Sequence, residues 1–469
     1  AEEKAALRQE RSELRAKQNR KAILALGGLI ICATLLIAML VGAIYNIVDQ
    51  FFIGQTVGIL GNSATNIAFP LTTLCTALAL LFGIGGASAF NLAMGRGQKD
   101  KAPYYIGNAA AALFVSGLIL CVITQIFLTP LLRAFGSPDD VLPFAQTYVR
   151  ITAFGFPFLV LTTGGGHLIR ADGSPQMTMI CSLSGAVINT VLDAVFVMGL
   201  NMGMAGAALA TIIGQIFSGC QVIWYLSRRF HTVPLGLQHL KPQLMTLRWV
   251  ASIGAGNCFN QMAMLISQIV LNNSLRHYGG LSVYGEAIPL AVAGIVMKVS
   301  QLCFGVIIGI SQGSQPIESF NYGARQYDRV RKAYRLALIA GGVVGVISFL
   351  LYQLLPRQIL ALFGEGTDVY FQFGVEFFRI FVFFAFANFM QPITATFFTS
   401  LGKPIKGVFL SLTRQVIFLI PLMLILPLFW GIDGILFAGP VADFFAMVAA
   451  IIMAAFEFRN MRQLEREGK

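Results

Sequence analysis

Runs of apolar residues alternate with short charged clusters along the whole chain. We count twelve such runs, each of roughly 20 residues or more, the length that a helix needs to cross ~30 Å of hydrocarbon. Their centres fall near residues 38, 80, 116, 156, 188, 216, 262, 300, 345, 385, 416 and 446. The pattern predicts an all-α membrane protein with twelve transmembrane helices.

The sequence also repeats itself at an offset of 228 positions. Gly95 and Gly136 of the first half return as Gly323 and Gly364 of the second half. Near the front of the repeat the offset falls to 219, so the second copy has gained a few residues. Each half holds six spans, an even number, and both copies therefore enter the membrane from the same side. We predict two six-helix bundles related by a parallel internal repeat.

Polar stretches divide the chain into two lobes with flanking segments. The longest polar connection lies between the two halves and contains Arg228, Arg229 and Lys241. The expected divisions are a basic N-terminal segment at 1–23, a first lobe at 24–227, an inter-lobe linker at 228–248, a second lobe at 249–457 and a tail at 458–469.

The chain is basic, with 33 Lys and Arg against 21 Asp and Glu, a net charge of +12. Most of the basic residues fall in the two terminal segments and in alternate loops, and cytoplasmic loops carry such an excess. We therefore expect both termini in the cytoplasm. Membrane topology explains the charge, so nucleic acid is not an expected partner. The seven cysteines lie in apolar runs without a CxxC pair, which favours neither a disulfide nor a zinc site, and no cofactor is expected.

Two acids inside the spans of the first lobe are the main candidates for chemistry. Asp49 and Asp193 each follow a polar residue by one helical turn, Tyr45 and Asn189 respectively, so each pair shares a helix face. A charge within a span costs ~2.5 to 3.5 kcal/mol on insertion scales, which favours a functional role. A buried carboxylate can load a proton and lose it to a cationic competitor. A purely structural role in helix packing remains the alternative.

The repeat places Gln268 opposite Asp49 and Pro421 opposite Asp193, so we expect coupling in the first lobe and substrate contacts in the second. The weaker candidates for a substrate cavity are Gln268, Met264, Met297, Lys298 and Asn46. Lys298 is either a counter-charge near mid-membrane or a structural lysine.

Other charged residues in or near the spans are interpreted as structural. Arg414 and Asp443 lie in adjoining spans and are expected to pair. Glu318, like Arg150, Glu376 and Arg379, lies near a span end. There the membrane–water interface lowers the free-energy cost of a charged side chain.

Five stretches together resemble the multidrug and toxic compound extrusion (MATE) family, the last of them its MepA-like branch of bacterial exporters. They are residues 46–54, 169–175, 189–193, 203–211 and 312–324. The resemblance runs from about residue 25 to residue 455 and implies two six-helix bundles in a V. It also implies cation-coupled antiport of organic cations, across the plasma membrane of a bacterium, by a monomer.

The resemblance also implies a coupling site. The family's site residues fall on Asp49, Tyr45, Asn189, Asp193 and Thr211. In the fourth span, relatives often have an asparagine where this chain has threonines. We include one of them, Thr163, among the candidate coupling residues.

Several alternatives remain open. A proton is favoured as the coupling ion, but a sodium version would use Asp49, Asp193, Asn189 and Thr211 as oxygen ligands. A lipid-linked oligosaccharide flippase would line its cavity with cationic residues, and here only Lys298 and Arg414 qualify. A membrane-embedded enzyme would need paired acids or paired histidines within the membrane. The chain has no GxxxxGK[ST] motif, so ATP is not indicated as the energy source.

Overall fold

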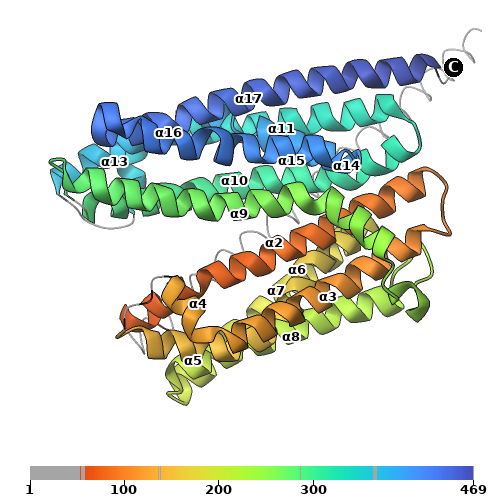
Figure 1. The fold of residues 1–469 in the computed structure, drawn as a ribbon, viewed down its shortest axis with the longest axis horizontal. Coiled ribbons are helices and arrows are strands. Elements are labelled where there is room, and N and C mark those ends of the chain that lie inside the picture. The colour runs from red at the N-terminus through yellow and green to blue at the C-terminus, as the bar shows by residue number, and fades with distance from the viewer. Residues whose placement is uncertain are drawn as a thin grey trace, which may run out of the picture.

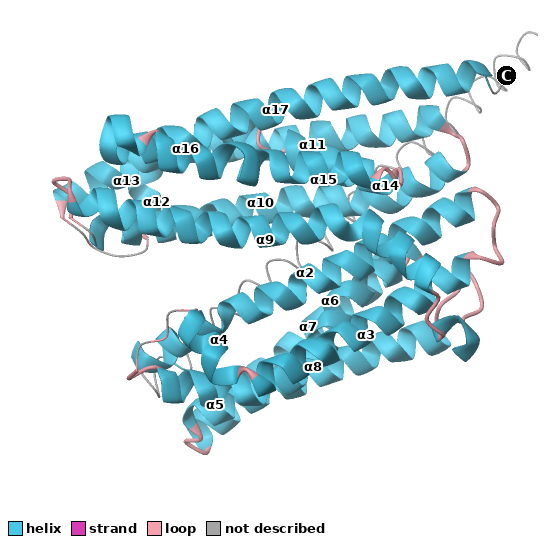
Figure 2. Cartoon of the chain, in the orientation of Figure 1, coloured by secondary structure: helices cyan, strands magenta, loops and turns pink. Residues whose placement is uncertain are grey.

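The computed structural model describes residues 53, 59–135, 137, 139–285, 287–362 and 367–467. These residues form helices joined by loops, and none of them forms a strand. Most of the loops lie at the two ends of the molecule (Figure 2). The all-α prediction is confirmed for this part of the chain.

The helices divide into two groups that we call the first and second lobes. The first lobe contains α2 (Ile59–Gly95), α3 (Ala102–Ile126), α4 (Leu128–Ala134), α5 (Leu142–Thr152), the 3-10 helix η1 (Ala153–Gly155), α6 (Phe156–Ala171), α7 (Pro175–Asp193), the π-helix η2 (Ala194–Gly199) and α8 (Gly203–Arg228). The short 3-10 helix η3 (Leu237–Leu240) lies in the connection to the second lobe.

The second lobe contains α9 (Leu244–Gly280), α10 (Ala287–Gly323), α11 (Tyr327–Leu354), α12 (Pro356–Ala361), α13 (Asp368–Phe381), the 3-10 helix η4 (Phe383–Phe386), α14 (Met390–Ser400), α15 (Pro404–Leu412), the π-helix η5 (Thr413–Leu419), α16 (Ile420–Ile425) and α17 (Pro427–Glu467). The two lobes approach each other at one end and diverge toward the other, which gives the molecule the shape of a V (Figure 1).

The element boundaries confirm the internal repeat. Helices α2 and α10 both have 37 residues. Their first residues, Ile59 and Ala287, and their last residues, Gly95 and Gly323, are each 228 positions apart. Each lobe also has a π-helix in the membrane-spanning part of the repeat, η2 in the first and η5 in the second. The two lobes are therefore copies of one helical plan that run in the same direction.

Nine helical segments of the described chain are long and apolar enough to cross a membrane. They coincide with nine of the twelve predicted spans. The span predicted near residue 262 is α9, and the one near residue 385 is α13 to α14, interrupted at η4 where Phe384 leaves helical geometry. The span predicted near residue 38 lies outside the described residues.

The outer faces of the lobes are apolar, as contact with lipid requires. On α3 the exposed side chains include Val115, Ile119, Val122 and Ile126, which recur every three or four residues and so share one helix face. A stripe of this kind along a helix of 25 residues is typical of a surface that faces hydrocarbon.

Glycines bring the two lobes into backbone contact at one end. A Cβ atom on Gly254 of α9 would lie 1.9 Å from the carbonyl oxygen of Leu81 on α2. A Cβ atom on Gly323 of α10 would lie 2.4 Å from the carbonyl oxygen of Leu92, also on α2. Neither position has room for a side chain. The closest approach of the lobes therefore depends on residues without one.

Polar side chains join the lobes at the same end. The Gln315 amide of α10 donates to the Ser88 hydroxyl of α2 at 2.6 Å. Arg170 of α6 donates to Gln312 Oε1 at 3.2 Å. We call this closed end the basic end, because the turn after α2 there carries Arg96, Lys99 and Lys101, and the turn after α10 carries Arg325.

The glycine contact can be tested by adding one methyl group. We expect Gly254→Ala to move the lobes apart at the basic end, because a Cβ atom cannot lie 1.9 Å from a backbone oxygen. The distance between spin labels on Lys99→Cys and Gln326→Cys, in a background without the native cysteines, should increase or broaden. The matched control is Gly294→Ala on α10, where a Cβ atom would meet nothing within 4 Å. An unchanged distance in Gly254→Ala would contradict the assignment.

Candidate functional site

A buried polar cluster lies between α7 and α8 in the first lobe. Asp193 is the last residue of α7 and is 0% exposed, and Asn189 is one turn earlier and 2% exposed. The Asn189 amide nitrogen donates to the Thr211 hydroxyl of α8 at 3.3 Å. Thr211 in turn donates to the Ala207 carbonyl at 2.9 Å. Two of the predicted coupling residues, Asn189 and Thr211, are thus in direct contact, with Asp193 on the same helix face.

Small residues allow this cluster to form. A Cβ atom on Gly214 of α8 would lie 3.1 Å from the Asn189 Cβ atom, and one on Gly185 of α7 would lie 1.9 Å from the Ser218 hydroxyl of α8. Because α7 and α8 pack so closely, the Asn189 side chain is enclosed between them. Its oxygen, Oδ1, is buried and accepts no hydrogen bond from the described residues.

The backbone geometry changes directly after Asp193. The α-helix α7 ends at Asp193, and the π-helix η2 begins at the next residue. Single π-helical turns inside helices are rare and occur often at functional sites. The wider turn after Asp193 shifts the helix faces on which the following residues lie.

The structure does not bring every predicted coupling residue into this cluster. Thr163 is half-buried on α6, and among the described residues no hydrogen bond joins it to Asn189, Asp193 or Thr211. Its neighbour Thr162 has a buried hydroxyl without a partner in the described chain. Asp49, Tyr45 and Asn46 lie outside the described residues.

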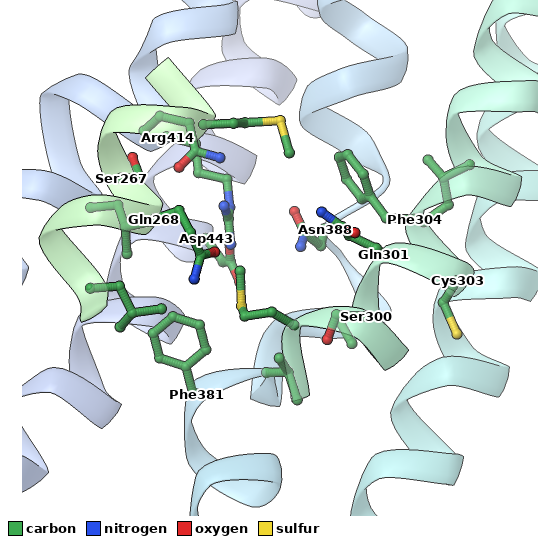
Figure 3. Close-up of a pocket in the computed structure, with 18 of the residues that line it drawn as sticks. Ser267, Gln268, Ser300, Gln301, Cys303, Phe304, Phe381, Asn388, Arg414 and Asp443 are labelled. Atoms are coloured by element: carbon green, nitrogen blue, oxygen red, sulfur yellow. The ribbon is translucent and has the colours of Figure 1, made fainter. Parts of the chain in front are cut away.

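A cavity of about 240 Å³ lies mainly in the second lobe (Figure 3). Gln268, Met264 and Met297 line it, as expected for cavity candidates. Phe69 and Thr73 of α2 also line it, so the cavity reaches the surface between the lobes. Lys298 does not line this cavity and is exposed on α10. Helical geometry gives the reason, because successive residues on a helix point about 100° apart.

An ion pair forms one wall of the cavity. Arg414 of η5 donates through Nε to a carboxylate oxygen of Asp443 on α17, which confirms the predicted pairing. Figure 3 shows both side chains beside Gln268, with Asn388 and Gln301 across the space from them. Asp443 is 4% exposed, so the guanidinium compensates a charge that water barely reaches.

Several polar atoms around the cavity have no partner in the described chain. They are the hydroxyl oxygens of Ser267, Ser300 and Tyr352 and the side-chain oxygen of Gln415. Buried polar atoms are normally hydrogen-bonded, so a group of such atoms around one cavity indicates a place for a polar ligand group. Our sequence analysis missed these residues, although Ser300 follows the candidate Met297 by less than one turn.

The comparisons with known proteins give one consistent result. The MatE family model matches residues 35–195 and 257–425. The multidrug export protein MepA of Staphylococcus haemolyticus (strain JCSC1435) is 23% identical over 444 residues, which cover 92% of this chain and 93% of that protein. MepA of Staphylococcus aureus (strain MSSA476) is 22% identical over 431 residues, covering 89% and 91%.

Solved structures of similar fold include a crystal structure of MATE in the bent conformation. Its TM-score is 0.86 at 20% identity, with 93% of this chain and 96% of that chain covered. The outward-facing conformation of a multidrug resistance MATE family transporter of the MOP superfamily gives a TM-score of 0.85 at 20% identity, with the same coverage of 93% and 96%.

The ion pair in the cavity wall gives a stability prediction. We expect Arg414→Met to lower the free energy of unfolding by ~3 to 5 kcal/mol, because it leaves a buried carboxylate without its partner. The double variant Arg414→Met with Asp443→Leu should recover most of the loss, since both charges are then absent. Thermal unfolding of the purified protein in detergent measures all three. A double variant as unstable as the sum of both single variants would contradict a direct pair.

Proposed function

Because the chain belongs to the MatE family of multi-pass membrane transporters, which are not enzymes, we propose that it is a secondary active multidrug exporter. It expels amphipathic organic cations while protons return through the first lobe. The similarity to the MepA multidrug export proteins over about nine-tenths of both chains supports this assignment.

One observation carries the proposal: the buried acid and the cavity occupy different lobes. Asp193 and its Asn189–Thr211 neighbours lie between α7 and α8. The cavity is lined mainly by the second lobe, and its first-lobe residues, Phe69 and Thr73, come from α2. Separate sites suit an exchange in which the coupling ion and the substrate affect each other through the relative position of the lobes.

The lining of the cavity supports an amphipathic substrate. Apolar side chains such as Phe304, Phe381 and Met264 provide contact area, and thioether and aromatic groups adapt to ligands of varied shape. The charges of Arg414 and Asp443 cancel each other. A cavity for a lipid-linked diphosphate would need a surplus of positive charge, and with Lys298 outside the lining this alternative is disfavoured.

The hydrogen bonds of the first-lobe cluster favour a proton over sodium. Thr211 donates its hydroxyl proton to the backbone and accepts from Asn189. A sodium ion prefers several oxygen ligands, and the Thr211 hydroxyl, with one lone pair taken by the Asn189 N–H, offers it only the other. A proton needs only a carboxylate, which Asp193 supplies. Asp49, by the repeat and the family resemblance, is the second acid of this pathway.

The basic end of the molecule is assigned to the cytoplasm, because basic loops remain on that side of the membrane. In this proposed orientation, the contact between the lobes at the basic end closes the transporter to the cytoplasm. As part of the same proposal, the chain lies in the plasma membrane of a bacterium and acts as a monomer.

The driving ion can be determined directly. We expect efflux of ethidium from vesicles that contain the full chain when a pH gradient is imposed without sodium. A sodium gradient imposed at equal pH on both sides should give no efflux above that of empty vesicles. The reverse result would assign the same residues to sodium. Efflux that needs neither gradient would contradict secondary active export.

The role of Asp193 gives a separate prediction. We expect Asp193→Asn to insert normally and to lose pH-driven efflux down to the level of empty vesicles, because the substitution removes only the titratable group. Asp139→Asn is the matched control, since the Asp139 side chain is 96% exposed in a loop. Full activity of a well-expressed Asp193→Asn protein would refute the assignment.

A further inference from the structure

Glu318 is a fully buried acid that the proposed transport cycle does not use. It lies on α10, five residues before the helix ends at Gly323, and is 1% exposed. The interpretation of Glu318 as an interface residue is therefore wrong. Both lobes cover this part of α10, because Gln315 binds Ser88 of the first lobe while α11 and α14 of the second lobe pack on the same helix.

The hydrogen bonds around Glu318 leave it without a donor. Neither of its carboxylate oxygens has a hydrogen-bond partner in the described chain. The hydroxyls of Ser314 and Ser400 lie beside it. Ser314 donates to the Ser311 carbonyl at 2.9 Å, and Ser400 donates to the Thr396 carbonyl at 2.9 Å. A hydroxyl has one proton, so while these bonds to backbone carbonyls hold, each serine oxygen is placed to accept a hydrogen bond from Glu318.

The titratable group that faces Glu318 from α11 is the Tyr334 phenol. Its hydroxyl is 2.8 Å from that of Thr394, and Thr394 donates to the Met390 carbonyl at 2.6 Å. Because Thr394 has already used its proton, Tyr334 is the donor in the pair. The phenol oxygen, like the serine oxygens, is available to Glu318 only as an acceptor.

The charged groups on neighbouring elements are engaged elsewhere. Arg170 contacts His167 of its own helix, α6, and Gln312 of α10. Lys403 and Lys406 both donate to Glu457 of α17. Among the described residues no cation pairs with Glu318, and an ionised carboxylate without a donor or counter-charge is costly to bury.

We propose that Glu318 is a proton-binding site of the second lobe, distinct from the Asp193 cluster, and that it is occupied while the lobes touch at the basic end. A protonated carboxyl group donates one hydrogen bond, and the hydroxyls around Glu318 can accept one. An ionised carboxylate only accepts, so it gains a hydrogen bond here only if a neighbouring hydroxyl gives up its bond to a backbone carbonyl.

The position of Glu318 connects its proton to the movement of the lobes. The segment of α10 from Gln312 to Gly323 supplies the inter-lobe contacts with Arg170, Ser88 and Leu92. When these contacts break, water reaches the segment and can solvate a carboxylate. Glu318 then releases its proton at the basic end, which is the cytoplasm if the proposed orientation holds.

Infrared spectroscopy of the full chain in lipid tests the proton site without measuring transport. At neutral pH we expect a carbonyl band of a protonated carboxylic acid in the unmodified protein that is missing in Glu318→Gln. The band should remain in Asp193→Asn, which separates this site from the proposed coupling acid. The control is Glu465→Gln, because the Glu465 carboxylate has a partner in Arg331, which Glu318 lacks. Identical spectra for the unmodified protein and Glu318→Gln would overturn the proposal.

The link to lobe movement has its own measurement. With spin labels on Lys99→Cys and Gln326→Cys, we expect the unmodified chain to shift to longer distances as the pH rises. Glu318→Gln should stay at the short distance at every pH, because its amide is never charged. Glu318→Met provides a second uncharged variant if the first folds poorly, and it should behave in the same way. A pH response that persists in both variants would overturn the link.

Discussion

The dominant constraint on this protein is that a polar group inside a bilayer has no water to bind and must find its partner within the protein. The described chain follows this rule at most positions and departs from it at a few. Asp443 is paired with Arg414, and the Asn189 amide nitrogen donates to Thr211. Buried polar atoms without a partner in the described chain occur in both lobes, and several of them line the cavity of the second lobe or belong to Glu318. Those are the places where a ligand or a proton can complete the hydrogen bonding.

The contact between the lobes follows a different principle. At the basic end the helices α2, α9 and α10 meet through glycines, and backbone oxygens occupy the space where side chains would lie. Dispersion contacts between backbones are strong only at close range, so a small separation loses most of them. An interface of this kind is either closed or open, with little in between. Such bistability suits a transporter that exposes its cavity to one side of the membrane at a time.

Much of the architecture could be predicted from the sequence. Nine of the predicted spans coincide with helices long and apolar enough to cross a membrane, and the equal lengths of α2 and α10 confirm the repeat. The interruption of the tenth span at Phe384 was not predicted, because residues 380–387 form an unbroken apolar run. The apolar character of a segment indicates its surroundings, whereas a local break in a helix depends on backbone geometry.

The site was only partly predictable, for a related reason. Asn189 was identified as the helical neighbour of an acid inside a span, and Thr211 was identified through the family resemblance. The structure places these two in contact. Lys298 was named as a cavity candidate although it does not line the cavity of the second lobe, and Glu318 was misread as an interface residue, because hydropathy gives depth in the membrane but not direction around the helix. Whether a side chain near a span end meets water or a second lobe depends on tertiary contacts that one sequence does not reveal.

The repeat shows how the two lobes have diverged in their acids. Asp193 of the first lobe corresponds to Pro421 of the second, at the offset of 228. Glu318 of the second lobe corresponds at the same offset to Phe90, which is fully buried. Each lobe thus places an acid where its counterpart has an apolar side chain. If one lobe alone carried the acids, protonation would bias only that lobe. With both acids binding protons as proposed, a proton gradient would act on the first lobe through Asp193 and on the closed end through Glu318.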